Sequence, residues 1–463
     1  MAAKPVPYYW NALDFAALTR EFPPPPMFEA TMRLSADELH ALQNRRFLQQ
    51  VERGWQVPFY RLHWGAVGLQ PGDIRSLEDI TKLPPYTVHD IRRSIERHPP
   101  FGDYMGIELG DHPLVLQTSG GTTGLPRPML YTPQDREVMS IIGGRRFHMQ
   151  GIRPGDVVQI TYSLGLGNGA SAPREALWKY SGAVPVTTGS GSQTPTRRQI
   201  ELLKAWGVSA ILGFPAYLRH MGELARDELG IDPRDLGLRS IGSHLGMDDR
   251  KPLEDLWGAP VFESYGSNES GIIAAEGPGR DGMTVFEDAY FVEIVDPETN
   301  REVAAGERGN AFITCLFKFA APVIRFNSND VSAFATDRSP IGWTHRRLQR
   351  IFGRADNMIK LRGVNVFPEA VGALVAEDPR SNGEYICIVE RVDAAGRDEM
   401  LVKVERSDPA VEAAALARDL EVRFREALGV KIAAEVVNRG DLDPLTGLTQ
   451  TSKIRRLLDR RKA

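Results

Sequence analysis

The residues best suited to chemistry form one short loop, residues 118–126, with the sequence TSGGTTGLP. Glycines let the backbone approach a ligand closely, and successive backbone N–H groups in such a turn form a nest for anions. The hydroxyls of Ser119, Thr122 and Thr123 add donors for phosphate oxygens. The loop therefore predicts a triphosphate-binding site, and a plain Gly/Thr-rich surface turn is the alternative.

Two common glycine-rich phosphate loops do not fit this sequence. The loop of P-loop NTPases ends in Gly-Lys followed by Ser or Thr, whereas Gly124 is followed by Leu125 and Pro126. The dinucleotide-binding fingerprint requires a different spacing of glycines. Neither class therefore explains the loop.

The loop resembles the phosphate-binding signature of adenylate-forming enzymes, the superfamily of acyl-CoA synthetases, peptide-synthetase adenylation domains and luciferases. Four later motifs resemble further motifs of the same superfamily. The later motifs follow in that superfamily's order: YGSNE at 265–269, RFNSND at 325–330, GRADNMIKLRG at 353–363 and TSKIRR at 451–456. Within the superfamily the chain most resembles the phenylacetate–CoA ligase branch, on the stretches 57–61, 76–84, 230–236 and 286–297.

The resemblance implies a reaction in two steps. The carboxylate of an acid attacks the α-phosphate of ATP and releases pyrophosphate, and a thiol then attacks the acyl-adenylate to give an acyl-CoA and AMP. Two anions meet in the first step, so the site must supply positive charge and hydrogen-bond donors. The implied cofactors are ATP, Mg²⁺ and coenzyme A, and the favoured substrate is an aryl or arylacetic acid resembling phenylacetate, indoleacetate or benzoate.

The same resemblance implies roles for individual residues. Lys453 and Thr122 are expected to be catalytic together with Glu269, the expected magnesium ligand, because Mg²⁺ prefers carboxylate and phosphate oxygens. Tyr265 would stack on adenine, and Asp330 would accept hydrogen bonds from the ribose hydroxyls. The other expected ATP contacts are Ser119, Gly120, Gly121, Thr122, Thr123, Gly124, Gly242, Ser243, Gly266, Asn268 and Arg354. The expected acid contacts are Phe147, Tyr162, Phe214 and His244, the expected hinge is Asp356, and the expected coenzyme A contacts are Arg362 and Gly363.

Each assignment has a plainer alternative. Tyr265 can be a core tyrosine at the end of a strand, and Asp330 can be a turn residue. Lys453 can begin a basic, solvated terminal helix, and the aromatic candidates can be ordinary core. For the whole chain, two other functions stay open. One is adenylation with a different acceptor, such as a carrier protein, an amine or a deazaflavin, and the other is an inactive nucleotide-binding regulator.

Four residues depart from the superfamily's usual pattern. Gly120 and Asn268 stand where hydroxyl residues are usual, Arg127 stands where many members have Lys, and Ser452 stands where Gly is usual. None of these changes removes a charge that the chemistry needs. No cysteine cluster lies in the middle of the chain, so the zinc site of some relatives is not expected.

Apolar patterning around the motifs predicts alternating strands and helices, which is typical of α/β layering. Strands are predicted at 114–116, 157–162, 210–212, 261–265, 291–295, 311–316, 385–389, 401–404 and 433–437. Helices are predicted at 197–206, 215–228 and 409–428, and Ser35 with Glu38 predicts a capped helix start. We therefore expect an α/β protein with a large N-terminal adenylation domain, residues 1–353, and a small, mobile α+β C-terminal domain, residues 354–463.

Composition sets the remaining bounds. A chain of 463 residues is too long for one ordinary core. The 56 basic and 60 acidic residues give a net charge of -4, so nothing favours nucleic acid or an anionic membrane as a partner. Cys315 and Cys387 lie in apolar runs typical of buried thiols. Without a membrane-length apolar run or a secretory signal, we expect a cytoplasmic protein, and the resemblance suggests a homodimer.

Overall fold

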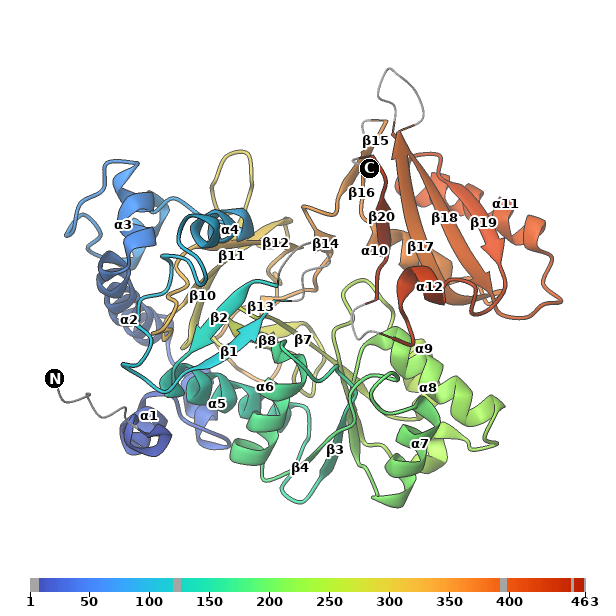
Figure 1. Ribbon diagram of the computed structural model, residues 1–463, viewed down its shortest axis with the longest axis horizontal. Helices are drawn as coiled ribbons and strands as arrows, with labels where there is room; N and C mark the ends of the chain where they lie inside the picture. Colours follow the sequence, from blue (N-terminus) through green and yellow to red (C-terminus); the bar gives the residue numbers. More distant parts are fainter. Residues whose placement is uncertain (1–7, 120–125, 363, 392–397, 451–453, 462–463) are drawn as a thin grey trace. The chain divides into compact units, whose positions relative to one another are not determined.

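The computed structural model describes residues 8–119, 126–362, 364–391, 398–450 and 454–461 (Figure 1). The chain divides into two compact units. The first comprises residues 1–158, 164–187 and 262–349, and the second comprises residues 159–163, 188–261 and 350–463. Both contain helices and β-sheets, so the predicted α/β class is confirmed. The boundary expected between residues 353 and 354 stays a prediction.

The first unit combines helices with mostly antiparallel strands. Its α-helices are α1 (Phe15–Glu21), α2 (Ala36–Gln56), α3 (Pro58–Gly65), α4 (Val88–Arg97), α5 (Pro133–Met149) and α6 (Asn168–Ala176). Its strands are β1 (Val115–Thr118), β2 (Pro128–Tyr131), β4 (Val184–Thr187), β8 (Gly271–Ala275), β9 (Met283–Val285), β10 (Tyr290–Val295), β11 (Gly309–Cys315), β12 (Phe326–Ser332) and β13 (Arg347–Leu348). Strands β3 (Val157–Ile160) and β7 (Val261–Ser267) cross the division between the units.

Local sequence explains how the main helices of this unit begin. Helix α2 starts at the predicted capping box, in which Ser35 and Glu38 satisfy each other's backbone N–H groups. Helix α5 has a second box between Thr132 and Asp135, and it is buried along nearly its whole length. Asp135 also accepts hydrogen bonds from the backbone N–H groups of Phe319 and Ala320, at 2.6 and 3.1 Å. One carboxylate thus joins the start of α5 to a loop far along the chain.

The sheets of the first unit follow the predicted apolar runs. Strand β11 pairs antiparallel with β10 and β12, and Tyr290 lies opposite Cys315. Strand β8 pairs antiparallel with β7 and β9. Strand β1 pairs with β2, so the strand predicted at 114–116 extends further, to Thr118. Cys315 is a buried free thiol, as its apolar neighbours predict.

The second unit contains an α/β part, mainly residues 188–261, and a small α+β part within residues 350–463. Its α-helices are α7 (Thr196–Ala205), α8 (Pro215–Asp227), α9 (Lys251–Trp257), α10 (Pro368–Ala376), α11 (Ala413–Leu428) and α12 (Asp443–Thr446). Its strands are β5 (Ala210–Leu212), β6 (Ser240–Ser243), β14 (Gly353–Arg354), β15 (Ile359–Leu361), β16 (Val364–Val366), β17 (Ser381–Arg391), β18 (Asp398–Arg406), β19 (Ala433–Val437) and β20 (Leu457–Asp459).

The small α+β part is built on a sheet of order β19-β18-β17-β20 (Figure 1). One face packs against α10 and α11 around a core that includes Cys387, Val402 and Phe424. The opposite face carries a smaller apolar cluster around Ile388 and Leu442. The sheet therefore contributes apolar side chains to a cluster on each face, and their burial stabilises it.

Two expectations for this part need correction. The helix predicted from residue 409 begins at Ala413, because the Glu412 side chain caps it by accepting from the N–H groups of Ala414 and Ala415. The alternative of a terminal helix is wrong for residues 457–459, which form β20 and pair in parallel with β17. A three-residue strand has no periodicity of its own and is defined only by its partner.

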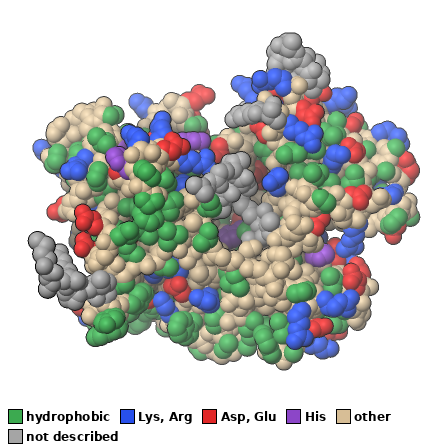
Figure 2. Space-filling view, viewed as in Figure 1, with side chains coloured by type: hydrophobic (Ala, Val, Ile, Leu, Met, Phe, Trp, Pro, Cys, Tyr) green, Lys and Arg blue, Asp and Glu red, His purple; other side chains and the backbone are tan. Residues whose placement is uncertain are grey.

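Two surface properties agree with the composition. Within the described residues, no helix is both long and apolar enough to cross a membrane. On the face drawn in Figure 2, basic and acidic side chains are interspersed, in keeping with the near balance of 56 basic and 60 acidic residues.

Candidate functional site

The hairpin of β1 and β2 frames the predicted phosphate loop. Thr118 lies opposite Pro128 in its register, and the Ser119 N–H donates to the carbonyl of Arg127 at 3.1 Å. The Arg127 Nε donates to Ser119 Oγ, also at 3.1 Å. The hairpin therefore brings the two ends of the loop together. Between them, Gly120, Gly121, Thr122, Thr123 and Gly124 lie outside the described residues.

The turn between β7 and β8 carries Asn268 and Glu269 beside this hairpin. Arg127 Nη2 lies 2.5 Å from Glu269 Oε1, and the two side chains are only 9% and 7% exposed. Asn268 Nδ2 donates to the Thr118 carbonyl at 3.1 Å. At Gly266, any side chain would collide with the Gly271 carbonyl, so the turn requires glycine there. Two motifs far apart in sequence thus meet in one unit.

A network of buried hydrogen bonds stabilises the same turn. The Tyr131 hydroxyl donates to the Asn268 carbonyl and accepts from Asn168 Nδ2 at 2.8 Å. Arg136 Nη1 in turn donates to Asn168 Oδ1 at 2.6 Å. Lys318 Nζ lies 4.0 Å from the centre of the Tyr131 ring, and within the described part of the chain it has no hydrogen-bond partner. Burial lowers the pKa of Lys318 and raises the pKa of Tyr131.

The expected adenine and ribose residues contact each other. The Tyr265 hydroxyl donates to Asp330 Oδ2 at 2.7 Å and lies 3.2 Å from Ser328 Oγ. The Asp330 N–H donates to Ser328 Oγ at 3.1 Å, after Asn329 turns the backbone at a φ of 61°. Tyr265 is 5% exposed, so the core alternative describes its position well, yet its hydroxyl orients a carboxylate that is only half-buried.

The aromatic candidates of the second unit gather where three neighbouring strands end. Strands β5 and β6 pair in parallel, and the Thr161 N–H, just beyond β3, donates to the Leu212 carbonyl at 2.9 Å. The residues that follow these strands are Tyr162, Phe214 and His244. Their rings are close: centroids lie 5.0 Å apart for Tyr162 and Phe214, and 6.0 Å apart for His244 and each of the others.

The backbone under this group is tightly packed. Ser243 is buried, and its hydroxyl donates to the Gly213 carbonyl at 2.8 Å. The Gly213 N–H donates to the Gly242 carbonyl at 3.1 Å. A side chain at Gly213 would collide with Thr161 Oγ1. The expected ATP contacts Gly242 and Ser243 therefore hold the loop in shape with their own hydrogen bonds.

The fourth aromatic candidate, Phe147, has different surroundings. It belongs to helix α5 of the first unit and is 1% exposed. The guanidinium of Arg146 lies 4.8 Å from its ring centre. This position favours the plain-core alternative for Phe147.

The expected hinge region forms short strands in the second unit. Arg354 and Asp356 make a two-point ion pair, with distances of 2.8 and 2.7 Å. Arg362 Nη2 lies 3.0 Å from Glu399 Oε1, and Gly363 lies outside the described residues. Arg354 is thus engaged by its neighbour, so a contact to ATP would have to compete with Asp356.

Lys453 also lies outside the described residues, but the chain that follows it is anchored. Arg456 makes a two-point ion pair with Glu384, at 2.8 and 3.0 Å, and donates to the Tyr385 carbonyl at 2.8 Å. The negative charge of Glu384 outweighs the effect of burial and raises the pKa of Arg456. No local pattern predicts this anchor, because its partners are 72 residues apart.

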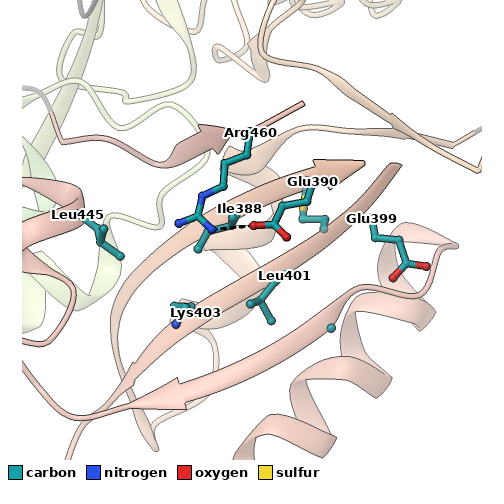
Figure 3. Close-up of a pocket in the computed structure, with 9 residues that line it drawn as sticks. Ile388, Glu390, Glu399, Leu401, Lys403, Leu445 and Arg460 are labelled. Carbon is teal, nitrogen blue, oxygen red and sulfur yellow. Dashed lines mark hydrogen bonds and ion pairs between the residues drawn. The ribbon is translucent and has the colours of Figure 1, made fainter. Parts of the chain in front are cut away.

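One pocket of the second unit is separate from these residues (Figure 3). It lies on the sheet face opposite α11 and is lined by Ile388, Glu390, Glu399, Met400, Leu401, Lys403, Ala433, Leu445 and Arg460. Arg460 and Glu390 form an ion pair of 2.7 Å at its rim. Every charged side chain that lines it is exposed or half-buried, and none of the expected site residues lines it.

The chain matches known families and proteins over most of its length. Residues 92–314 match the family model described as AMP-binding enzyme, and residues 363–461 match the one described as AMP-binding enzyme C-terminal domain. A phenylacetate-coenzyme A ligase of Aromatoleum evansii is 31% identical, with 95% of this chain and 98% of that protein covered. One of Escherichia coli (strain K12) is 30% identical, with 88% and 93% covered.

Solved structures agree with these matches. A 2-hydroxyisobutyryl-CoA ligase in the postadenylation state superposes with a TM-score of 0.81 at 28% identity, covering 100% of this chain and 97% of that one. The same ligase in complex with 2-HIB-AMP and CoA in the thioesterification state gives a TM-score of 0.68 at 29% identity, covering 93% and 91%.

Proposed function

The chain belongs to the superfamily of AMP-binding, adenylate-forming enzymes, in which it is an acid–CoA ligase, and we propose that its acid is an aryl or arylacetic acid. The similarity to phenylacetate-coenzyme A ligases, at 30–31% identity over most of the chain, supports this substrate class. ATP, Mg²⁺ and coenzyme A are the proposed cofactors.

The observation that carries the proposal is the aromatic group Tyr162, Phe214 and His244. In α/β sheets, ligands bind beyond the carboxyl ends of the strands, which is where these residues lie. Flat aromatic walls favour a planar ring by stacking and edge-to-face contact. The His244 ring adds a polar group that can donate to the acid's carboxylate.

The first unit supplies groups suited to ATP. Asp330, held by Tyr265, would accept from the ribose hydroxyls, and Ser119 would donate to a phosphate. Among the described residues there is no cluster of three or more acidic, His or Cys side chains that would make a complete metal site. One buried carboxylate, Glu269, which is paired with Arg127 in this structure, instead fits Mg²⁺, which commonly takes one or two carboxylates plus substrate phosphates. Bound there, Mg²⁺ would offset the charge of the phosphates.

The proposed mechanism assigns charge compensation to Lys453. Its ammonium would neutralise the approaching carboxylate and the α-phosphate as a compact point charge. Pyrophosphate leaves as the acyl–phosphate bond forms, and the thiol of coenzyme A then displaces AMP. Asp356 would be the pivot between the two steps, since a few residues at the end of an element can absorb such a rotation.

The proposal can be tested by ATP–pyrophosphate exchange with phenylacetate, indoleacetate, benzoate, a fatty acid and 2-hydroxyisobutyrate, followed by addition of coenzyme A. We expect the fastest exchange with an aryl or arylacetic acid and thioester formation with the same acid. Fastest exchange with 2-hydroxyisobutyrate would refute the aromatic substrate. Exchange without a thioester would point to another acceptor.

Two variants test whether Phe214 lines the acid pocket, in contrast to the core residue Phe147. Phe214→Leu should raise KM for the aryl acid and leave KM for ATP unchanged, because only the pocket wall is shortened. Phe147→Leu is the matched control, since Phe147 is buried in α5. It should lower the melting temperature without changing KM for the acid. The opposite pattern would remove Phe214 from the pocket.

A further inference from the structure

The ion pair between Arg127 and Glu269 occupies the carboxylate proposed for magnesium. The guanidinium follows the phosphate loop directly, and the carboxylate lies in the β7–β8 turn. Their 2.5 Å contact is almost completely buried, with 9% and 7% of the side chains exposed. A metal ion bound at the same oxygen would lie beside the guanidinium, and the two positive charges would repel each other.

Arg127 is also incompletely satisfied in its present position. Its Nε donates to Ser119 and its Nη2 to Glu269. Its Nη1 is buried and, as far as the described residues reach, has no hydrogen-bond partner. A buried, planar guanidinium with a spare donor is suited to a multiply charged oxyanion such as a phosphate, two of whose oxygens can accept parallel N–H bonds.

We propose that Arg127 is an exchange residue: it neutralises Glu269 when the site holds no nucleotide and transfers its guanidinium to the polyphosphate when magnesium-bound ATP enters. This inference rests on the proposed function, in which ATP binds at the loop. Charge balance supports the exchange. Before binding, the buried carboxylate needs a cation, and a lone buried charge is strongly destabilising. After binding, Glu269 would hold Mg²⁺ in place of the guanidinium, and the triphosphate would carry more negative charge than Mg²⁺ cancels.

The exchange has a consequence for metal-free ATP. Without Mg²⁺, Arg127 must leave Glu269 unpaired in order to reach the phosphates, so ATP binds weakly. Glu269→Gln removes this competition and frees the guanidinium. In the wild-type background we expect this change to tighten metal-free ATP binding about tenfold. In an Arg127→Gln background, only the general loss of a negative charge remains, and the gain should fall to about twofold.

Isothermal titration calorimetry with ATP in EDTA, repeated with excess Mg²⁺, measures this coupling in the wild type, both single variants and the double variant. Glu137→Gln is the matched control. Glu137 is 3% exposed and lies 2.6 Å from Lys179 in the same unit, so its loss should leave ATP affinity unchanged. Should Arg127→Gln fail to fold, Arg127→Lys takes its place, and the gain should fall to about threefold because Lys lacks the planar fork.

The outcomes separate the two proposals. Equal gains from Glu269→Gln with and without the Arg127 guanidinium, while MgATP still binds the wild type, would overturn the exchange and leave the proposed function intact. Failure of the wild type to bind MgATP would overturn the proposed function and the exchange together. If the gain in metal-free ATP affinity from Glu269→Gln depends on Arg127, the exchange is supported. This result comes from a binding measurement and requires no turnover.

Discussion

Replacing Tyr265 with Phe tests whether Asp330 binds the ribose of ATP. The substitution removes the hydroxyl that donates to Asp330 Oδ2 at 2.7 Å and keeps the buried ring. A hydrogen bond to a charged acceptor contributes about 1.5–3 kcal/mol, and the half-buried position of Asp330 favours the lower end. If the misoriented carboxylate loses about 1.5 kcal/mol of ribose binding, KM for ATP rises about twelvefold.

The assay compares KM for ATP with KM for 2′,3′-dideoxy-ATP in pyrophosphate exchange. The analogue lacks the hydroxyls that Asp330 would hold, so Tyr265→Phe should raise KM for ATP and leave KM for the analogue almost unchanged. The preference for ATP should therefore shrink about tenfold. Tyr180→Phe is the matched control, because the Tyr180 hydroxyl also donates to a buried carboxylate, that of Glu137, at 2.6 Å.

An equal rise of both KM values in Tyr265→Phe would show that the Tyr265 hydroxyl does not act through the ribose hydroxyls. That result would mean that the Tyr265 hydroxyl acts on the nucleotide site as a whole or through the fold, and not by orienting Asp330 toward the ribose. A fall in melting temperature alone, shared with Tyr180→Phe, would likewise support only a structural role.

Three further predictions follow from single residues. Lys453→Ala should slow pyrophosphate exchange at least about a hundredfold while leaving the Kd of MgATP within about threefold, and a small rate effect would remove Lys453 from the chemistry. Burial lowers the pKa of His220, with the charge of Arg439 acting in the same direction. The unfolded chain therefore binds a proton that the folded chain does not, and stability should fall as pH drops below about 6.5. Between pH 7 and pH 5.5, the free energy of unfolding measured with urea should fall less for His220→Asn than for the wild type. An equal fall in both proteins would contradict this prediction. Gly213→Ala should lower the free energy of unfolding by about 1–3 kcal/mol and raise KM for the acid, because the new methyl group collides with Thr161 Oγ1. An unchanged melting temperature and an unchanged KM would show that the ends of the strands tolerate the methyl group.

Elements with a strong local signal could be predicted from the sequence. Strand β19 has the predicted bounds, α8 differs from its prediction by one residue, and the capping box of α2 is present. These features depend on neighbours a few residues apart, which the sequence shows directly. Strand β20 could not be predicted, because three residues next to a basic run become a strand only beside β17.

The site was predictable in its parts and not in its contacts. The motifs predicted that Tyr265, Asp330 and Glu269 belong to the site. They did not predict the hydrogen bond between Tyr265 and Asp330 or the ion pair between Arg127 and Glu269. Partners 65 and 142 residues apart meet only after the sheets have formed. Arg127 carried one usable sign, its place as the first cation after a phosphate loop.

The pairing of β20 with β17 separates anchoring from chemistry. Leu457 packs into the core on one face of the sheet and Leu458 into the cluster on the other, so a slip of one residue would exchange their environments. The Arg456 carbonyl accepts from the Cys387 N–H at 2.9 Å, which fixes the start of this strand as well. The segment that follows Lys453 is thus held by its pairing with β17 and by two apolar clusters, neither of which includes Tyr162, Phe214 or His244. The side chains proposed to contact the acid can therefore be substituted without removing any of these contacts that hold β20.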